Sequence, residues 1–239
     1  MSDAQTLEDD GFVVLRDLID DATLADIWEH AADLLTFYRT PAQRSGLSIA
    51  MQLSELHDAS KDALYRWCLA VARTPPVLRL FDHPRVQGLR FGTFPMSRQY
   101  LVDPCAFFNR RDVTRLQYDW HVESAYYPNA SEVLTLWFPF LHSVNEENGT
   151  MVMAAGSHRA AFAHTIVPVP GGLDQARIDP ALLADYQKVP MNLALGDAVM
   201  FSARTAHATG KNRTAVPRLS MLFRISDNAA ALDGGWRRP

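Results

Sequence analysis

Residues 196–225 read GDAVMFSARTAHATGKNRTAVPRLSMLFRI, and the run that begins at Arg218 predicts the fold most directly. Side chains of a β-strand alternate between its two faces, so residues two apart point the same way. The residues on one face of this run are all apolar: Leu219, Met221, Phe223 and Ile225. The other face carries polar residues: Arg218, Ser220 and Arg224. The alternation predicts a strand with one apolar and one polar face.

Similar short runs, rich in aromatic and β-branched residues, fill the chain from about Gln87 onwards and are separated by Gly, Pro and Asn. They predict strands at 89–94, 105–109, 115–123, 132–141, 150–155, 198–202 and 218–225. Many short strands are typical of an antiparallel sandwich or barrel. Asn148-Gly149 lies between two of the apolar runs and predicts a hairpin turn.

The first third of the chain predicts helices. A short strand at 12–15 (FVVL) comes first, and a helix with Asp20 or Asp21 as its cap follows. The apolar residues of that helix recur at helical spacing: Leu24, Ile27, Trp28, Ala31 and Leu34. A second helix fits 61–73, with Pro75 and Pro76 to end it, and 77–83 fits a further helical turn.

The stretch 159–188 interrupts the strand pattern with Pro168, Pro170, Gly171 and Gly172, followed by a short helix candidate at 180–186. Long excursions of this kind are often functional, and we interpret this one as a lid. No linker divides the chain, so we expect one domain over residues 1–239. A helical layer at about 1–86 would pack on a jelly-roll or barrel core at about 87–226. The predicted fold class is mainly β, of the α+β type.

The composition favours a small-molecule partner. Charged residues make up 21% of the 239 residues and the formal net charge is −4, which gives no basic face for DNA or RNA. The N-terminus does not resemble a signal peptide, and no apolar run is long enough to span a membrane. We therefore expect a cytoplasmic protein without nucleic-acid or membrane partners. The two cysteines, Cys68 and Cys105, make no disulfide framework, and the oligomeric state stays open.

The stretch QYDWHVESAYYP, residues 117–128, contains the first candidate site residues. On a regular strand, His121 and Glu123 would project from one face, and Gln117 and Asp119 would continue it. A neutral imidazole beside a carboxylate suits a divalent metal. Two His and one carboxylate on one side of Fe(II) form the facial triad of non-haem oxygenases. A polar pair on a sheet face is the alternative interpretation.

The other half of such a site would be a later histidine. Of the eight histidines, His207 is the best placed, because it follows GDAVMF, a tight turn and then a strand. Arg218 and Ser220 further along can bind one carboxylate together, since the guanidinium is a planar two-pronged donor and the hydroxyl adds a third bond. A cofactor with a carboxylate at one end and metal-chelating oxygens at the other would bridge Arg218 and the metal. 2-Oxoglutarate is such a molecule.

Four segments, in this order, resemble the phytanoyl-CoA dioxygenase family of Fe(II)/2-oxoglutarate oxygenases: DGFVVLRDLIDDATLADI at 10–27, WHVESAYYP at 120–128, ENGTMVMAAGSHR at 147–159, and 196–225. The resemblance implies a double-stranded β-helix fold of jelly-roll type. It implies that iron is held by His121, Glu123 and His207. It also implies that Arg218 pairs with the distal carboxylate of 2-oxoglutarate, with Ser220 as helper.

The chain departs from the family pattern at two places. The family usually has Asp where this chain has Glu123, although related oxygenases that resemble clavaminate synthase use Glu. Halogenating members lack the carboxylate altogether, so Glu123 argues against a halogenase. The segment AAGSH replaces the usual PGSH, which is a loop detail; Ser157 and His158 within it are interpreted as turn residues.

The expected function is an Fe(II)- and 2-oxoglutarate-dependent dioxygenase that uses O2 to hydroxylate an unactivated C–H bond of a small molecule, such as a natural product or an amino acid. Succinate and CO2 would be released. Gln117, Asp119 and Tyr126 are candidate substrate contacts, and one of Arg98, Arg110, Arg111 and Arg115 is a candidate for binding an acidic substrate group. The alternatives are a cupin-like metal enzyme without 2-oxoglutarate, a non-catalytic binding module, and desaturation, cyclisation or epimerisation in place of hydroxylation.

Overall fold

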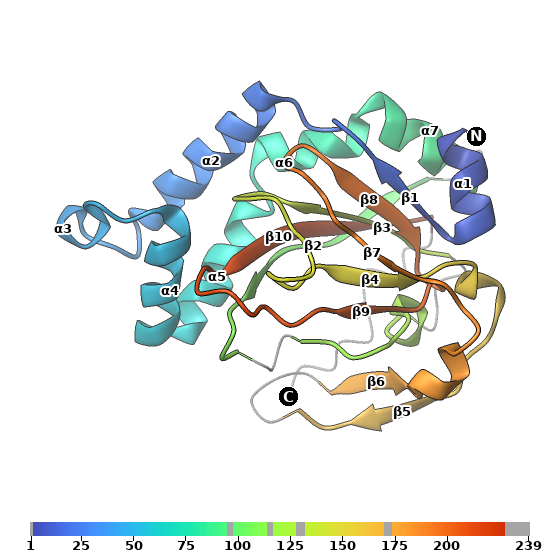
Figure 1. The fold of residues 1–239 in the computed structure, drawn as a ribbon. Helices are drawn as coiled ribbons and strands as arrows, with labels where there is room; N and C mark the ends of the chain where they lie inside the picture. The colour runs from blue at the N-terminus through green and yellow to red at the C-terminus, as the bar shows by residue number, and fades with distance from the viewer. Residues whose placement is uncertain (1, 95–97, 114–116, 128–131, 170–173, 228–239) are drawn as a thin grey trace.

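A five-stranded antiparallel sheet forms the centre of the computed structural model, which describes residues 2–94, 98–113, 117–127, 132–169 and 174–227 (Figure 1). Its strands, in spatial order, are β1 (Phe12–Leu15), β8 (Ala198–Ser202), β3 (Leu134–Pro139), β10 (Arg218–Ser226) and β2 (Tyr100–Asn109). The long strand β10 lies between β2 and β3, so its backbone is hydrogen-bonded on both sides. Ser220, for example, is opposite both Phe107 and Pro139.

A second, three-stranded sheet faces the first. Its order is β7 (Lys188–Pro190), β4 (Met151–Ala154) and β9 (His207–Thr209). Apolar side chains from both sheets fill the space between them, among them Trp137 on β3, Met153 on β4 and Phe201 on β8. A separate two-stranded hairpin, β5 (His164–Val167) and β6 (Gln175–Ile178), lies beyond the second sheet (Figure 1).

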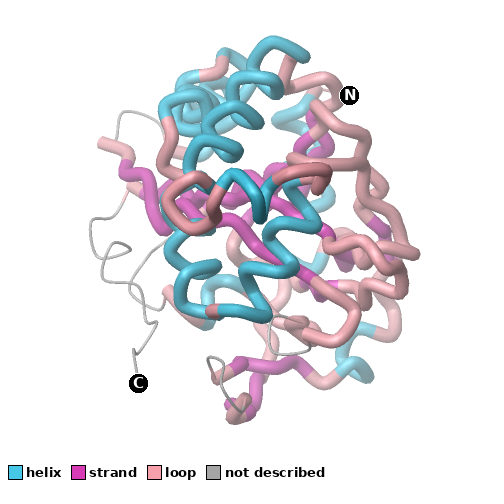
Figure 2. The backbone as a smooth tube through the Cα atoms, turned by 90° about the vertical axis from the view of Figure 1, so that its left-hand side faces the viewer, coloured by secondary structure: helices cyan, strands magenta, loops and turns pink. Residues whose placement is uncertain are grey.

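Helices cover the other face of the five-stranded sheet (Figure 2), while one short helix, Pro41–Arg44, projects to the side and buries no residue (Figure 1). The α-helices are α1 (Asp3–Asp10), α2 (Asp21–Leu35), α3 (Pro41–Arg44), α4 (Ile49–Ala59), α5 (Lys61–Val71), α6 (Pro75–Arg79) and α7 (Pro84–Thr93). The apolar face of β10 packs into this layer, because Leu219, Met221, Phe223 and Ile225 share one buried cluster with Ile27 and Trp67. The predicted mainly β jelly roll with an N-terminal helical layer is confirmed.

Several local predictions are also confirmed. The strand at 12–15 is β1, and Asp20 caps α2 by accepting a hydrogen bond from the backbone N–H of Thr23 at 2.7 Å. Helix α5 ends before Pro75, but Pro75 and Pro76 then begin α6, because proline suits the first turn of a helix.

None of the described helices is long and apolar enough to cross a membrane.

Three predictions about the strands are wrong. Residues 89–94 belong mostly to α7, which begins at Pro84, is capped by His83 and extends the helical layer past 86. The described part of 115–123 is not a strand: 117–120 are loop, His121 makes an isolated bridge, and a 3-10 helix, η3, spans Glu123–Ala125. Asn148-Gly149 makes a turn but not a hairpin, because β3 and β4 lie in different sheets.

The excursion at 159–188 is more regular than expected. It contains the β5–β6 hairpin and a 3-10 helix, η5 (Pro180–Leu183), which is shorter than the predicted helix at 180–186. Another 3-10 helix, η4 (Ser157–Arg159), precedes it. There Ser157 accepts a hydrogen bond from the backbone of Ala206 at 2.9 Å, and His158 contacts the Glu8 carbonyl at 3.0 Å, as expected for turn residues.

Candidate active site

His121, Glu123 and His207 form a buried cluster between the two sheets. Their potential ligand atoms all lie within 4.8 Å of one another, and each residue is at most 6% exposed. The two histidines are opposite each other in an antiparallel bridge, with backbone N···O distances of 3.0 and 2.9 Å. Their ring centroids are 4.2 Å apart. The sequence-predicted triad therefore meets in space, although not on one strand.

Both imidazoles are oriented by their own backbone. Nδ1 of His121 lies 2.7 Å from the Asp119 carbonyl, and Nδ1 of His207 lies 2.9 Å from the Thr205 carbonyl. A carbonyl oxygen only accepts hydrogen bonds, so each Nδ1 must carry the proton. The Nε2 atoms are then left with free lone pairs, which is the tautomer that a metal ligand requires.

The protonation states also suit a cation. Burial, with a contribution from His207, lowers the pKa of His121 to about 3, so its imidazole is neutral. Burial alone would raise the pKa of Glu123, but the charge of Arg224 holds it below its ordinary value. The cluster therefore presents a neutral imidazole and a carboxylate anion in a buried site. Those are the ligand types of a two-histidine, one-carboxylate iron site.

A pocket of about 500 Å³, including the part that opens to solvent, adjoins the cluster. Its described lining residues are Phe107, Tyr118, His121, Glu123, Tyr126, Trp137, Met151, His207, Thr209, Arg218, Ser220, Leu222 and Arg224. The polar face of β10 therefore forms one wall, and the His121–His207 bridge forms another. Aromatic side chains from β2, β3 and the loop before η3 line much of the remainder.

Arg218 and Ser220 have unused hydrogen-bonding groups in this pocket. Arg218 is 3% exposed, and its Nε and one Nη have no hydrogen-bond partner among the described residues. The hydroxyl of Ser220, which is fully buried, has none among them either. Burial lowers the pKa of Arg218 to about 10, which leaves the guanidinium charged at neutral pH. Buried polar groups are almost always paired, so these atoms are free to bind an anion that enters the pocket. The distal carboxylate of 2-oxoglutarate is such an anion.

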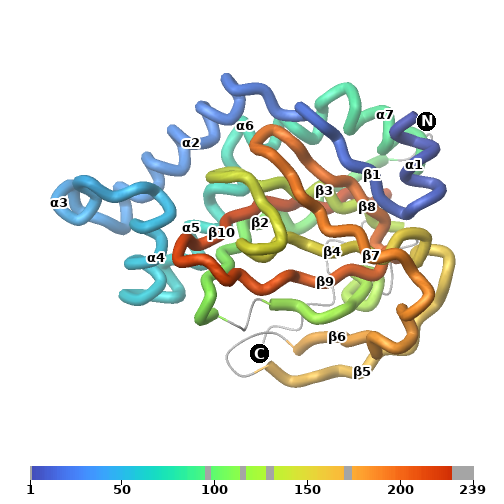
Figure 3. Tube along the Cα trace, in the orientation of Figure 1, coloured from blue at the N-terminus to red at the C-terminus, as the bar shows by residue number. Residues whose placement is uncertain are grey.

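The loop that carries His121 lies between β9 and the β5–β6 hairpin, as Figure 3 shows. It is hydrogen-bonded to both. His121 bonds to β9, whereas the carbonyl of Trp120 accepts a hydrogen bond from Ile178 at 2.7 Å. Further along, the Tyr126 hydroxyl accepts from the backbone N–H of Ala176 at 3.0 Å. Tertiary hydrogen bonds therefore replace the regular ladder that the sequence predicted.

The three candidate substrate residues have different positions. Tyr126 lines the pocket. Gln117 and Asp119 do not belong to its described lining: the Asp119 carboxylate is paired with Arg177 at 2.8 Å, and the Gln117 carbonyl accepts from Gln175 at 3.2 Å. The expected common face of 117, 119, 121 and 123 is therefore wrong, because it depended on a regular strand.

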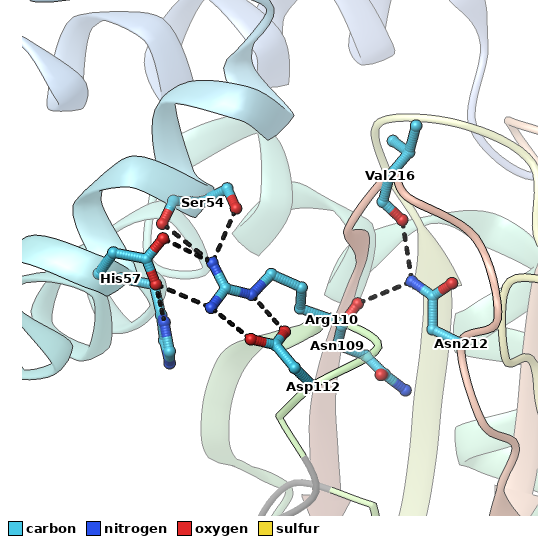
Figure 4. Close-up of polar contacts among 8 residues, drawn as sticks. Ser54, His57, Asn109, Arg110, Asp112, Asn212 and Val216 are labelled. Atoms are coloured by element: carbon cyan, nitrogen blue, oxygen red, sulfur yellow. Dashed lines mark hydrogen bonds and ion pairs between the residues drawn. The ribbon is translucent and has the colours of Figure 1, made fainter.

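The four arginines proposed to bind an acidic substrate group also have different positions. Arg110 pairs with Asp58 and Asp112 and bonds to Ser54, so it joins α4 to the end of β2 (Figure 4). Nearby, Asn212 donates to the carbonyls of Asn109 and Val216 (Figure 4). Arg98 and Arg111 are exposed, and Arg115 lies outside the described residues. Arg110 is thus committed to structural ion pairs.

The sequence analysis placed Arg224 on the polar face of its strand but gave it no role in the site. The structure buries it in the pocket wall, with Nε 2.9 Å and an Nη 2.8 Å from Oε2 of Glu123. The signal was present in the alternation of β10, which puts Arg224 on the same face as Arg218 and Ser220.

The chain is similar to solved structures that include 2-oxoglutarate-binding and α-ketoglutarate-dependent enzymes. The epimerase SnoN, crystallised with Fe3+, α-ketoglutarate and nogalamycin RO, has a TM-score of 0.64 at 20% identity, covering 94% of this chain and 82% of that one. EvdO2 from Micromonospora carbonacea var. aurantiaca, complexed with 2-oxoglutarate, has a TM-score of 0.61 at 20% identity, covering 93% and 89%. EctD from S. alaskensis, with 2-oxoglutarate and 5-hydroxyectoine, has a TM-score of 0.63 at 18% identity, covering 93% and 74%.

The family follows from the sequence match. The model of the family described as phytanoyl-CoA dioxygenase (PhyH) matches residues 7–220. The chain therefore belongs to the phytanoyl-CoA dioxygenase family, whose members are Fe(II)- and 2-oxoglutarate-dependent oxygenases acting on small molecules. The predicted family, enzyme class and cofactors are confirmed at that level. No curated protein matches the chain in sequence.

Proposed function

We propose that this protein hydroxylates an unactivated C–H bond of a small organic molecule. The reaction consumes one O2 and one 2-oxoglutarate for each substrate, and it releases succinate and CO2 with the hydroxylated product. One oxygen atom enters the product and the other enters succinate. In this proposal residues 1–239 act as one oxygenase domain.

His121, Glu123 and His207 hold the iron in this proposal. When bound, iron with 2-oxoglutarate activates O2 for attack on a C–H bond. The protein supplies two Nε2 atoms as donors, on imidazoles oriented by the backbone carbonyls of Asp119 and Thr205, and one carboxylate. A set of two imidazoles and one carboxylate would leave positions on the metal open for cofactor and O2.

Arg218 and Ser220 hold the far end of 2-oxoglutarate. Their unpaired donors on the same face of β10 are the single observation that carries the proposal beyond a generic metal site. A charge-assisted contact to a carboxylate satisfies the buried guanidinium and sets the distance of the cofactor from the iron ligands. A cupin-like enzyme without 2-oxoglutarate has no use for these donors.

The substrate lies against the aromatic part of the pocket. Phe107, Tyr118 and Tyr126 line it beside the histidine cluster, so a substrate with an apolar portion near the reacting carbon is favoured. Tyr126 is the substrate-contact candidate that we retain. The segment 159–188 serves as the lid. Its strand β6 is hydrogen-bonded to the loop that carries His121, so substrate binding beside that loop can change the position of the segment.

The test begins without O2. Metal-stripped protein is titrated with Fe(II) and 2-oxoglutarate, and the weak visible charge-transfer band of the chelate is recorded. We expect the band in the wild type and its loss in His121→Ala. Fe(II) binding without a band would favour the cupin-like alternative, and no binding at all would favour a binding module.

A substrate panel then follows, scored by succinate release and by product mass. Hydroxylation adds one oxygen to the substrate, whereas desaturation or cyclisation removes two hydrogens and epimerisation leaves the mass unchanged. The likeness to SnoN, which its structure describes as an epimerase, makes the unchanged-mass outcome the second candidate. Succinate release with an unchanged product mass would replace hydroxylation by epimerisation.

A further inference from the structure

Arg224 is the buried cation of the site that neither the iron nor the 2-oxoglutarate assignment uses. We propose that Arg224 is a positioning residue that anchors Oε2 of Glu123, so that this unusually long ligand binds iron through Oε1 alone. The inference rests on the proposed function, because it concerns the same metal site. It assigns a role to a residue that touches a ligand of the iron and not the iron itself.

The two oxygens of Glu123 have different surroundings. Oε2 is contacted twice by Arg224, by Nε at 2.9 Å and by an Nη at 2.8 Å. Oε1 faces the other ligands and lies 3.6 Å from Nε2 of His207. The side chains of Arg224 and Glu123 are 4% and 6% exposed, so solvent screens their contact little. The carboxylate is therefore held with one oxygen toward Arg224 and one toward the histidine cluster.

Glutamate needs such an anchor more than aspartate does. Its extra methylene adds a rotatable bond between backbone and carboxylate, so the ligand oxygen can adopt more positions. It can also present both oxygens to the metal and thereby occupy a position that the cofactor or O2 requires. A guanidinium fixed on Oε2 restricts both, because hydrogen bonds to ligands orient them and tune the metal.

The fold holds Arg224 itself in place. Between Leu222 and Arg224, β10 advances by two residues while β2 advances from Val102 to Cys105, so β2 carries a bulge. Asp103 lies in this bulge with a φ of 45°, and its carboxylate accepts a hydrogen bond from the Tyr127 hydroxyl at 2.7 Å. The guanidinium carbon of Arg224 lies 5.4 Å from the centroid of the Tyr127 ring. Bulges next to functional sites commonly re-aim side chains.

The experiment measures metal affinity and cofactor affinity separately. Apoprotein of the wild type, Arg224→Gln and Arg224→Lys is titrated with Mn(II), read by electron paramagnetic resonance, and then with 2-oxoglutarate on the metal-loaded protein without O2. We expect Arg224→Gln to weaken Mn(II) binding about 10- to 100-fold, the usual effect of losing a hydrogen bond to a ligand. Arg224→Lys, which keeps the charge, should restore part of that loss.

Arg90→Gln is the matched control. Arg90 is equally buried at 3% and is paired with a carboxylate, Asp82, but it lies on α7 and does not line the pocket. This variant should lower the unfolding temperature without changing the Mn(II) affinity. If Arg224→Gln behaves in the same way, with lower stability and an unchanged metal affinity, Arg224 is a structural residue and the inference is wrong.

A double-mutant cycle identifies the partner through which Arg224 acts. Glu123→Asp withdraws the carboxylate by one methylene from the guanidinium. We expect Arg224→Gln to cost at least threefold less in Mn(II) affinity in the Glu123→Asp background than in the wild type. Effects that simply multiply would show that the two residues act independently. If Arg224→Gln does not fold, Arg224→Lys completes the same cycle.

Two outcomes separate the inference from the proposed function. A wild type that binds no metal and gives no chelate band contradicts the proposed function. A wild type that binds both, with a variant whose 2-oxoglutarate affinity falls while its Mn(II) affinity is unchanged, contradicts only the role assigned here. Arg224 would then be a cofactor ligand and not an anchor for Glu123.

Discussion

His121 and His207 each donate a backbone hydrogen bond to the other's carbonyl oxygen, although His121 is not part of a strand. Two potential iron ligands far apart in sequence are thereby brought together by main-chain bonds that do not involve their imidazoles. Each imidazole is oriented in turn by the carbonyl two residues before it. Ligand geometry is thus a property of the backbone, which makes the site preorganised.

This arrangement predicts that removing one imidazole abolishes metal binding without unfolding the protein. In His207→Ala the bridge to His121 can persist, because only backbone atoms form it. We expect loss of Fe(II) binding and of turnover, with the far-ultraviolet circular dichroism spectrum unchanged. Equilibrium dialysis with Fe(II) under argon measures the first effect. Wild-type activity in this variant would exclude His207 as a ligand.

We expect Arg218 to increase the affinity for 2-oxoglutarate and to lower the stability of the cofactor-free fold. Two nitrogens of its buried guanidinium have no partner in the described part of the chain, so Arg218→Met should leave the cofactor-free protein as stable or more stable. The affinity for 2-oxoglutarate should fall by about 1.5–3 kcal/mol, or roughly 10- to 150-fold. Isothermal titration and thermal unfolding measure the two effects in one sample. An unchanged 2-oxoglutarate affinity would show that another residue binds the distal carboxylate.

Ser220→Ala is the companion to that experiment. The hydroxyl is uncharged, so its loss should weaken the binding of 2-oxoglutarate by only about 0.5–1.5 kcal/mol. A larger effect than that of Arg218→Met would reverse the roles assigned to the two residues.

The hairpin β5–β6 should loosen when the Tyr126 hydroxyl is removed. In Tyr126→Phe the buried N–H of Ala176 loses its acceptor, which costs about 1–3 kcal/mol locally. Peptides from 164–178 should then exchange amide hydrogens faster. If the hairpin belongs to a lid, 2-oxoglutarate should also be consumed with less product formed. Tyr186→Phe, which removes a hydroxyl nearby and keeps the ring contact with Phe162, is the control; equal exchange in both variants would contradict the role of Tyr126.

The sequence predicted the faces of β10 because strand alternation is a local property, and it predicted the triad because the residue types and their order are informative. It could not predict the path of 117–126. Tyr118, Val122 and Tyr126 are buried there, so a loop that packs into the protein has the composition of a strand, while its hydrogen bonds go to β6 and β9. The ion pair between Arg224 and Glu123 could not be predicted either, because the two residues are far apart in sequence and meet only in the folded protein.

Helix α7 illustrates a second limit. Residues 89–94, at its C-terminal end, include two phenylalanines and a glycine, which together resemble a strand and its turn. The start signal lies upstream, where His83 caps the helix and Pro84 occupies its first turn. The buried side chains Val86, Leu89 and Arg90 then pack it against its neighbours. Packing therefore outweighs the intrinsic preferences of Phe91 and Thr93.

The Arg110 ion pairs should make part of the stability depend on acid pH. Hydrogen bonds from Arg110, and a smaller contribution from His57, lower the pKa of Asp58 from 3.8 to about 2, and Arg110 also lowers the pKa of Asp112. A carboxylate whose pKa is lower in the folded protein stabilises it fully above the unfolded value. That contribution is lost as the pH falls from about 4 through 2.

Arg110→Gln should therefore be less stable than the wild type at neutral pH, and the difference should shrink below pH 4. The titrating part is at most about 1 kcal/mol, because Asp58 and Asp112 are 62% and 64% exposed and solvent screens both pairs. A difference should remain in acid, because the bond from Arg110 to Ser54 does not titrate. Arg66→Gln, which breaks an exposed pair with Asp62 within α5, is the control and should change little. Urea unfolding at a series of pH values measures both variants, and a stability difference independent of pH would show that the ion pairs contribute nothing.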